Sequence, residues 1–545
     1  MLLVILDTDI MLQNIILSRL YNANNLSFSG ATKINIFYFS DYHAVIPAYR
    51  HLKTASDTFD KKHEDSENLK LSAGDVFSGT ELKKRDLVSK ILKSMNFDAC
   101  AIGNHDRGRN FNFYEYLKNN HLTNQKNKAE GKESEFFTDF MACNTETPND
   151  KEYNKLGLFK SKIVTKNGEK FGLIGVTTPD YKTNYCKLHN ISLIKNDIEQ
   201  EIQKLKEQEP ELDKIILLSH LGTKEERKIA KIVSDIDIII GGHSHDNEYE
   251  LFESPKKEPV LIVQEGNEKT FGELTVEFDE NGRIDLSKGN SPKNKVDKVF
   301  NYSASEDIKR LEKDTLGETY PVGTLVREFS SKRAVKKENP ILNIMTDAIL
   351  NKTGADLALV NPGSVRSLME AGKITARDVE YCFPMPHPVV TVKYTKQQLA
   401  DVIREGVEST KLRKIKPGIM HVSGARYTVT ADKKVKDFYT VDENGNKKIE
   451  IIDSKGNIVS DENPEKPTLL TVAVSEYVIS NPQNMFNSLK KIKIEDDKET
   501  IDRSQIISSF DTERNILIDY FQSNFMKKNK EIDVDTNRIT LESKI

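Results

Sequence analysis

Apolar runs of strand length alternate with polar and helix-patterned stretches along the first half of the chain. The runs occupy residues 34–39, 69–72, 97–102, 171–176, 215–218, 236–240 and 259–264. Between two of them, Leu82, Val88, Leu92 and Met95 recur at helical spacing. Strands that alternate with helices predict a layered α/β domain, in which functional residues stand in the loops at strand ends.

The second half of the chain begins a new pattern. Residues 303–316 are polar and contain no glycine or proline, which predicts an exposed helix joining two domains. Further helices are expected at 341–352 and 396–408, and strands at 357–360, 389–394, 425–430 and 468–474. Because 545 residues are too many for one core, two domains are expected.

Composition narrows the class of protein only slightly. A net charge of -4 gives no reason to expect binding of a nucleic-acid polymer or an anionic membrane. The four cysteines are scattered, which excludes a disulfide framework or a zinc knuckle.

The N-terminus leaves localisation open. Asp7 and Asp9 interrupt the apolar residues 1–6 and no basic residue precedes them, so this is a poor signal peptide. It is also too short for a membrane span, which needs about 20 apolar residues. Residues 1–32 are interpreted as a leader or as upstream sequence from a misassigned start, and both export and a cytoplasmic location stay possible.

Residues of metal-ligand type follow five of the apolar runs, and five of the eleven histidines lie among them. The motifs are Asp41-Tyr42-His43, Gly74-Asp75, Gly103-Asn104-His105-Asp106, Ser219-His220-Leu221-Gly222 and Gly241-Gly242-His243-Ser244-His245.

Each motif alone has an ordinary interpretation. Asp41 and His43 stand at i and i+2, which in an extended segment would point both side chains to one side. The alternative is a capping aspartate beside an unrelated histidine. Gly74 would let the chain turn tightly and direct Asp75 into a cleft, although a lone Gly-Asp pair is more often a turn or a helix cap.

The ordered set favours a metal site. Carboxylate, amide and imidazole ligands without cysteine suit Mn, Zn, Fe, Co or Ni. Two such cations about 3.5–4 Å apart would lower the pKa of a shared water and clamp both oxygens of an in-line displacement at phosphorus. The five motifs therefore predict a dinuclear phosphoester-cleaving site.

With these motifs in this order, the chain from Lys33 to its end resembles the bacterial 5'-nucleotidase and UDP-sugar hydrolase family. These are calcineurin-like metallophosphoesterases with an added C-terminal nucleotide-binding domain. The resemblance implies an α/β fold with a four-layer α/β/β/α metallophosphoesterase domain at residues 33–298. A linker helix at 299–320 and a smaller α/β substrate-binding domain at 321–545 would follow.

The resemblance also implies roles for the motif residues. One ion would be held by Asp41, His43, Asp75 and His245, and the other by Asp75, Asn104, His220 and His243. His105 would not bind metal; it would stabilise the transition state or assist the leaving oxygen. The family places an aspartate three residues after this histidine to orient it, but position 108 is glycine here, so either Asp106 supplies that partner or no residue does.

The second domain matches the family less closely. Residues Asn361, Gly363 and Arg366 resemble its Asn-x-Gly-Gly-x-Arg loop, in which the arginine would pair bidentately with the anionic end of the substrate. The family stacks the base between two rings. Tyr477 would supply one, but the expected Phe is Met385, whose thioether packs more loosely, and the Gly-Gly-Asp-Gly segment reads Asn481-Pro482-Gln483-Asn484.

The sequence therefore predicts a hydrolase in which a metal-bound hydroxide attacks a nucleotide phosphoester. Its substrate would be a nucleoside monophosphate, a nucleotide sugar or a 2',3'-cyclic nucleotide. One alternative keeps the metal chemistry but acts on a non-nucleotide phosphoester or a sulfur ester. Another is a non-catalytic binding protein on this fold. No membrane span is expected, and the oligomeric state is left open.

Overall fold

The computed structural model describes residues 32–542 with internal gaps. The gaps are 79–80, 109–110, 147–159, 181–184, 267–268, 288, 331–335, 386, 411–417, 481–491, 496–497, 502–505 and 535, and side chains are also not described within 480–505. The predicted leader and the segment Asn481–Asn484 lie outside the described residues. The chain divides into two compact units, the first ending at Glu318 and the second beginning at Thr319.

Two six-stranded sheets form the centre of the first unit. One has the order β14-β13-β1-β2-β3-β4, and the other has the order β11-β12-β10-β9-β7-β6. The strands of the first sheet are β14 (Lys293–Lys298), β13 (Thr270–Phe278), β1 (Thr32–Phe39), β2 (Leu69–Ser72), β3 (Ala99–Ala101) and β4 (Phe140–Met141). Those of the second are β11 (Asn247–Glu253), β12 (Pro259–Glu265), β10 (Ile238–Gly241), β9 (Ile215–His220), β7 (Glu169–Thr177) and β6 (Ser161–Lys166).

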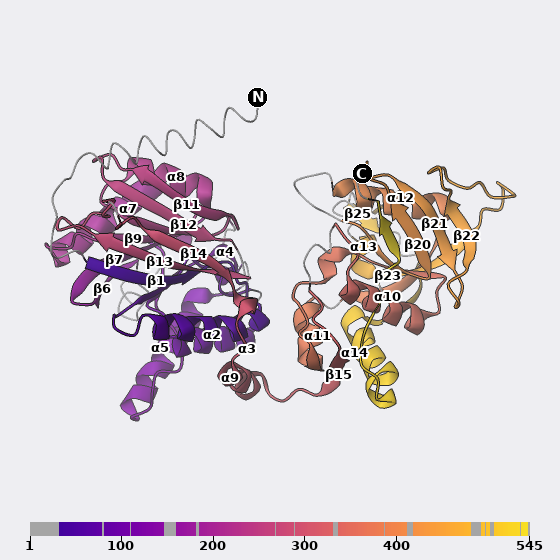
Figure 1. The fold of residues 1–545 in the computed structure, drawn as a ribbon, viewed down its shortest axis with the longest axis horizontal. Helices are drawn as coiled ribbons and strands as arrows, with labels where there is room; N and C mark the ends of the chain where they lie inside the picture. Colours follow the sequence, from indigo (N-terminus) through magenta and orange to yellow (C-terminus); the bar gives the residue numbers. More distant parts are fainter. Residues whose placement is uncertain are drawn as a thin grey trace. The chain divides into compact units, whose positions relative to one another are not determined.

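The sheets pack face to face and helices cover both outer faces. Ile34 and Ile36 of β1 share one buried cluster with Ile216 and Leu218 of β9. The ring of Phe37 points the other way and lies 5.5 Å from that of Phe59 in α2. Figure 1 shows α2 (Ile46–Lys62), α3 (Leu82–Ser94) and α5 (Phe113–Ala129) on one side of the sheets, and α7 (Ile191–Gln208) and α8 (Thr223–Ile232) on the other. The layers are therefore α/β/β/α, as predicted.

The strand directions bring the five motifs to one edge of each sheet. β1, β2 and β3 run parallel to one another, and so do β9 and β10. Asp41, Asp75 and Asn104 follow the carboxyl ends of the first three strands, while β9 ends at His220 and β10 at Gly241. Parallel strands place their carboxyl ends at the same edge, so the motif loops meet there.

The helix expected at 303–316 is α9 (Glu306–Leu316). It is held against α2, because Nε of Arg50 donates to Oε2 of Glu312 at 3.0 Å and the backbone N–H of Ser305 donates to the carbonyl of Arg50. Glu312 is buried. The helix thus packs against α2 within the first unit, close to its end at Glu318. Among the described helices, none combines the length and apolar character needed to cross a bilayer.

The second unit also contains two main sheets. One has the order β19-β16-β23-β18-β26 and the other the order β22-β21-β20-β27. The first comprises β19 (His421–Ser423), β16 (Leu357–Val360), β23 (Leu469–Ser475), β18 (Pro388–Thr395) and β26 (Ile506–Thr512). The second comprises β22 (Lys447–Ile452), β21 (Val435–Val441), β20 (Ala425–Val429) and β27 (Ile539–Leu541), and α12 (Lys396–Ser409) packs near it.

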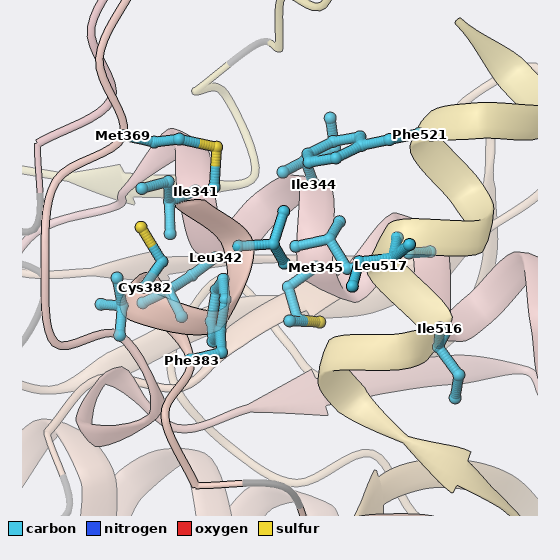
Figure 2. Close-up of a cluster of buried hydrophobic side chains, with 14 of the residues drawn as sticks. Ile341, Leu342, Ile344, Met345, Met369, Cys382, Phe383, Ile516, Leu517 and Phe521 are labelled. Atoms are coloured by element: carbon cyan, nitrogen blue, oxygen red, sulfur yellow. The ribbon is translucent and has the colours of Figure 1, made fainter. Parts of the chain in front are cut away.

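Three helices, together with Ala358 and Val360 of β16, form one buried apolar core in this unit. Figure 2 shows Leu517 and Phe521 of α14 (Glu513–Asn524) directed toward Ile344 and Met345 of α10 (Pro340–Thr353). Phe383, which follows α11 (Ala376–Cys382), belongs to the same buried cluster. Burial of this cluster fixes the first turn of α14 inside the unit.

Glu513 carries a carboxylate into that buried first turn. The residue is 2% exposed, and its Oε1 atom makes no hydrogen bond within the described part of the chain. Burial therefore raises the pKa of Glu513 to about 8.

We expect this carboxyl to make folding pH-dependent. Because the folded pKa lies above the ordinary one, the favourable contribution is complete below about pH 4.5 and is lost as pH rises toward 8. Between these pH values the free energy of unfolding of the wild type should fall by up to about 1.4 kcal/mol per pH unit. In Glu513→Gln this fall should be absent. Urea unfolding of the full chain at pH 5, 6.5 and 8 tests this; parallel pH profiles for wild type and variant would contradict it.

Candidate metal centre

Asp41 and His43 adopt backbone conformations that the sequence pattern did not predict. β1 ends at Phe39, and both residues lie in the left-handed region, with φ of 57° and 48°. The extended geometry expected for this pair is therefore wrong. The strained loop is held because the N–H groups of Asp41 and His43 donate to the carbonyls of Gly74 and Asp75, at 2.9 and 2.8 Å.

Asp75 occupies the middle of the site. Asp75 is 1% exposed and also has a positive φ, of 53°. Oδ1 accepts the backbone N–H of His105 at 2.8 Å, while Oδ2 lies 3.1 Å from Nε2 of His220 and 3.8 Å from Nδ1 of His43. One carboxylate therefore faces ligands from two different strand ends.

His220 is fixed in orientation by the strand beside it. The Nδ1 atom lies 2.7 Å from the carbonyl oxygen of Ala73, which can only accept, so Nδ1 carries the hydrogen. The lone pair of Nε2 is then directed at Asp75. Nε2 of His220 and Oδ2 of Asp75 are then both acceptors, and they lie 3.1 Å apart. This contact is favourable only when a proton or a metal ion lies between the two atoms.

The last motif approaches from the second sheet. His243 and His245 both have positive φ values, of 74° and 56°. The backbone N–H of His243 donates to Oδ2 of Asp41 at 2.9 Å. Nε2 of His245 lies 3.4 Å from Oδ1 of Asp41 and 3.4 Å from Nε2 of His43. The loop thus closes over Asp41 through both its backbone and a ring.

The donor atoms group into three overlapping sets, in each of which every ligand atom lies within 4.8 Å of the others. The sets are Asp41–His43–His245, His43–Asp75–His105 and Asp41–Asp75–His220. His105 is close enough to His43 and Asp75 to act as a ligand, and its ring lies 4.7 Å from that of His43.

Two buried atoms of the motif residues fit the same chemistry. Oδ1 of Asn104 and Nδ1 of His43 are buried and have no hydrogen-bond partner within the described residues. A buried polar atom without a partner is costly, and a cation would satisfy both. Oxygen and nitrogen donors in this arrangement suit divalent cations. The residues present therefore fit the metal ions that the motifs predict.

Electrostatic interactions keep the two central carboxyls ionised. Burial opposes ionisation of Asp41, yet His245 and His220 hold its pKa below the usual value. Burial also opposes ionisation of Asp75, but the neighbouring His220 and His43 lower its pKa. Burial lowers the pKa of His43 to about 4, so this ring is neutral at pH 7 and offers a lone pair.

Asp106 contacts the backbone of two motif loops. One carboxylate oxygen accepts the N–H groups of Gly103 and Asp75 at 2.7 and 2.9 Å, and the other accepts that of Phe77 at 2.8 Å. Burial and the charge of Asp75 raise its pKa to about 6. These contacts give Asp106 a structural task that differs from the orientation of His105 expected from the sequence.

The predicted substrate-binding residues lie in the second unit. Asn361, which is buried, follows β16 and accepts a hydrogen bond from Oγ of Ser364, and Gly363 lies in the same turn. Arg366 is exposed, and its backbone N–H donates to the carbonyl of Cys382, which brings this loop beside the segment of Met385. Met385 and Tyr477 are also exposed.

Sequence reasoning missed His387. Its ring stacks on Tyr477 with centroids 4.7 Å apart and planes at 25°. Its backbone N–H donates to the carbonyl of Met385. One face of the Tyr477 ring is therefore already covered by an imidazole. The sequence singles out Met385, two residues before His387. However, no local pattern predicts a contact between His387 and Tyr477, which are 90 positions apart.

Buried charged residues beneath the site were also missed. Arg85 and Arg107 are 0% and 1% exposed, and Glu226 lies so close to Gly241 that a Cβ there would come within 2.4 Å of its carboxylate. A signal existed for Arg85, because it interrupts the apolar stripe of residues 82, 88, 92 and 95 at helical spacing.

Comparison with known proteins agrees with this geometry. Residues 34–247 match the family model of the calcineurin-like phosphoesterases, a class whose fold implies divalent metal ions. Residues 316–491 match the model of the 5'-nucleotidase C-terminal domain. The chain belongs to the family that joins these two domains.

The chain is also similar to proteins of known sequence and structure. The trifunctional nucleotide phosphoesterase YfkN of Bacillus subtilis is 26% identical over 74% of this chain, which spans only 29% of that protein. The 5'-nucleotidase of Mus musculus is 26% identical over 59% of this chain and 60% of its own length. The 5'-nucleotidase precursor of Thermus thermophilus shares the fold, with a TM-score of 0.56 at 19% identity, covering 94% of this chain and 100% of that one.

Metal binding should stabilise the folded chain. At about 100 times the dissociation constant, Mn²⁺ or Co²⁺ should raise the free energy of unfolding by about 2.7 kcal/mol. Asp75→Asn should lose most of this gain, whereas Asp57→Asn, which changes an exposed carboxylate of α2, should keep it. Unfolding with metal and with chelator measures the effect; an equal gain in Asp75→Asn would contradict the assignment.

Proposed function

We propose that this chain hydrolyses phosphate esters of nucleotides at a dinuclear metal centre. The observation that carries the proposal is the position of Asp75, whose Oδ2 faces His220 on one side and His43 on the other. One carboxylate placed in this way can serve two ions. The match to a 5'-nucleotidase C-terminal domain supports a nucleotide as the substrate.

The proposed ligand sets are those that the family resemblance implies. One ion would be held by Asp41, His43, Asp75 and His245, and the other by Asp75, Asn104, His220 and His243. Divalent cations supply Lewis acidity toward the phosphoryl group and a water of lowered pKa when they are bound.

The protein's own groups complete the reaction. His105 is presented beside the ligands by its backbone N–H, which donates to Oδ1 of Asp75. From there its ring can donate a hydrogen bond to the phosphoryl oxygens, or a proton to the departing alkoxide, as a positioned histidine does. Arg366 would pair with the anionic end of the substrate, and Tyr477 would offer a ring to the base.

A panel of esters tests the proposal. Hydrolysis of AMP, UMP, UDP-glucose, a 2',3'-cyclic nucleotide and p-nitrophenyl phosphate, each followed by its own product, should require Mn²⁺, Zn²⁺ or Co²⁺ and be abolished in Asp75→Asn. His105→Gln should lower kcat by about 10²–10⁴-fold while metal-induced stabilisation stays. His121→Gln, which changes a histidine on α5, is the matched control and should leave the rate unchanged. Turnover that survives Asp75→Asn would contradict the proposal.

The same panel decides a second candidate. The stack of His387 on Tyr477 and the presence of Met385 favour a non-nucleotide phosphoester, because they leave less ring surface for a base. A lower KM for AMP or UMP than for p-nitrophenyl phosphate would support the nucleotide. Equal KM values with full dependence on Asp75 would support the second candidate.

A further inference from the structure

The short helix that presents His105 lies between two buried guanidinium groups. This helix, α4 (Asn104–Arg107), is one turn long and ends at Gly108, whose φ is 60°. A helix of one turn leaves its last carbonyl groups without partners in the helix itself. Arg85 and Arg107, both buried, supply donors to the surrounding carbonyls.

Arg85 caps the carboxyl end of α4. From α3, its Nη1 donates to the carbonyl of Asp106 at 2.7 Å and its Nη2 to the carbonyl of His105 at 3.3 Å. The flat face of the guanidinium lies 3.9 Å from the ring centroid of Phe111. A planar fork that bonds two successive carbonyls and stacks on a ring has little freedom to move.

Arg107 ties the same turn to another loop. Its Nη2 donates to the carbonyls of Thr178 and Asp180 at 2.8 and 3.2 Å, and its Nε donates to that of Gly103 at 3.4 Å. Thr178 directly follows β7 of the second sheet. The turn that carries His105 is therefore anchored to both sheets of the first unit.

Burying two guanidinium groups costs free energy unless well-placed acceptors compensate for the lost water. Position 108 is glycine, so no side chain stands one turn beyond His105 to hold its ring. With the backbone clamped, the Cβ of His105 is fixed in place, and the edge-to-face contact with His43 limits the ring.

We infer that Arg85 and Arg107 are positioning residues that hold His105 in place through its backbone. The inference rests on the proposed function, in which His105 acts on the phosphoryl group or the leaving oxygen. Lysine keeps the positive charge but cannot bond two carbonyls with one flat group. Arg85→Lys and Arg107→Lys should therefore loosen the turn, and a small misplacement of a catalytic group costs about 10²-fold in rate.

A double-mutant cycle separates positioning from general destabilisation. Each lysine variant is made in the wild-type chain and in His105→Gln, and kcat, KM and Mn²⁺ affinity are measured on the full chain. In the wild-type chain kcat should fall about 10–100-fold while KM stays within about 2-fold. Mn²⁺ affinity should fall much less than kcat, because Asn104 is only one of the proposed ligands and lies at the other end of the turn. In His105→Gln the same changes should have almost no further effect on kcat. Arg50→Lys, which weakens the pair with Glu312, is the matched control.

The outcomes are distinguishable. Equal losses of kcat in both backgrounds, or a parallel loss of Mn²⁺ affinity, would overturn the inference and leave the proposed function standing. If His105→Gln itself loses no activity, the role of His105 fails and the inference fails with it. Should Arg85→Lys not fold, Phe111→Leu removes the surface under the guanidinium and enters the same cycle with the same expected result.

Discussion

The carboxylate of Asp106 is the interaction on which the geometry of the metal centre depends. It is fully buried and accepts three backbone N–H groups, from Gly103, Asp75 and Phe77. These belong to two loops that follow neighbouring parallel strands, and one loop carries Asp75 while the other carries Asn104. Three donors offset much of the cost of removing a carboxylate from water. Without this contact the two loops would share few polar bonds, and the ligands on them would separate.

Five of the seven proposed ligands have an unusual backbone conformation. Asp41, His43, Asp75, His243 and His245 all have positive φ, which is uncommon outside glycine, although aspartate and histidine adopt it more often than most residues. Hydrogen bonds between loops stabilise these conformations, as when His43 donates to the carbonyl of Asp75. Glycine at position 103 allows the two loops to approach closely, because a Cβ there would come within 2.0 Å of Oδ1 of Asp75. Strain of this kind persists where surrounding contacts hold it, and it commonly marks functional sites.

Much of the fold could be predicted from the sequence because the buried parallel strands are continuous apolar runs. The runs at residues 69–72 and 215–218 coincide with β2 and with most of β9 for this reason. Charged strands such as β14, whose sequence is Lys-Asn-Lys-Val-Asp-Lys, carry no such signal, because they lie at a sheet edge and are partly exposed.

Within the site, residue types and their order predicted which side chains would meet, but not how. The i, i+2 spacing of Asp41 and His43 suggested a strand, whereas the backbone turns left-handed at both. The contacts of Arg85 with the His105 turn and of His387 with Tyr477 join distant segments, and such pairings depend on the packed fold. Local sequence therefore predicts the ligands better than it predicts the groups that support them.

The number of ions bound by the chain tests the central proposal most directly. Electron paramagnetic resonance of the full chain loaded with Mn²⁺, recorded beside its phosphatase activity, distinguishes coupled from isolated ions. Two ions about 3.5–4 Å apart should give the spectrum of a spin-coupled pair that appears together with activity. A spectrum of isolated Mn²⁺ in a fully active protein would contradict the dinuclear centre.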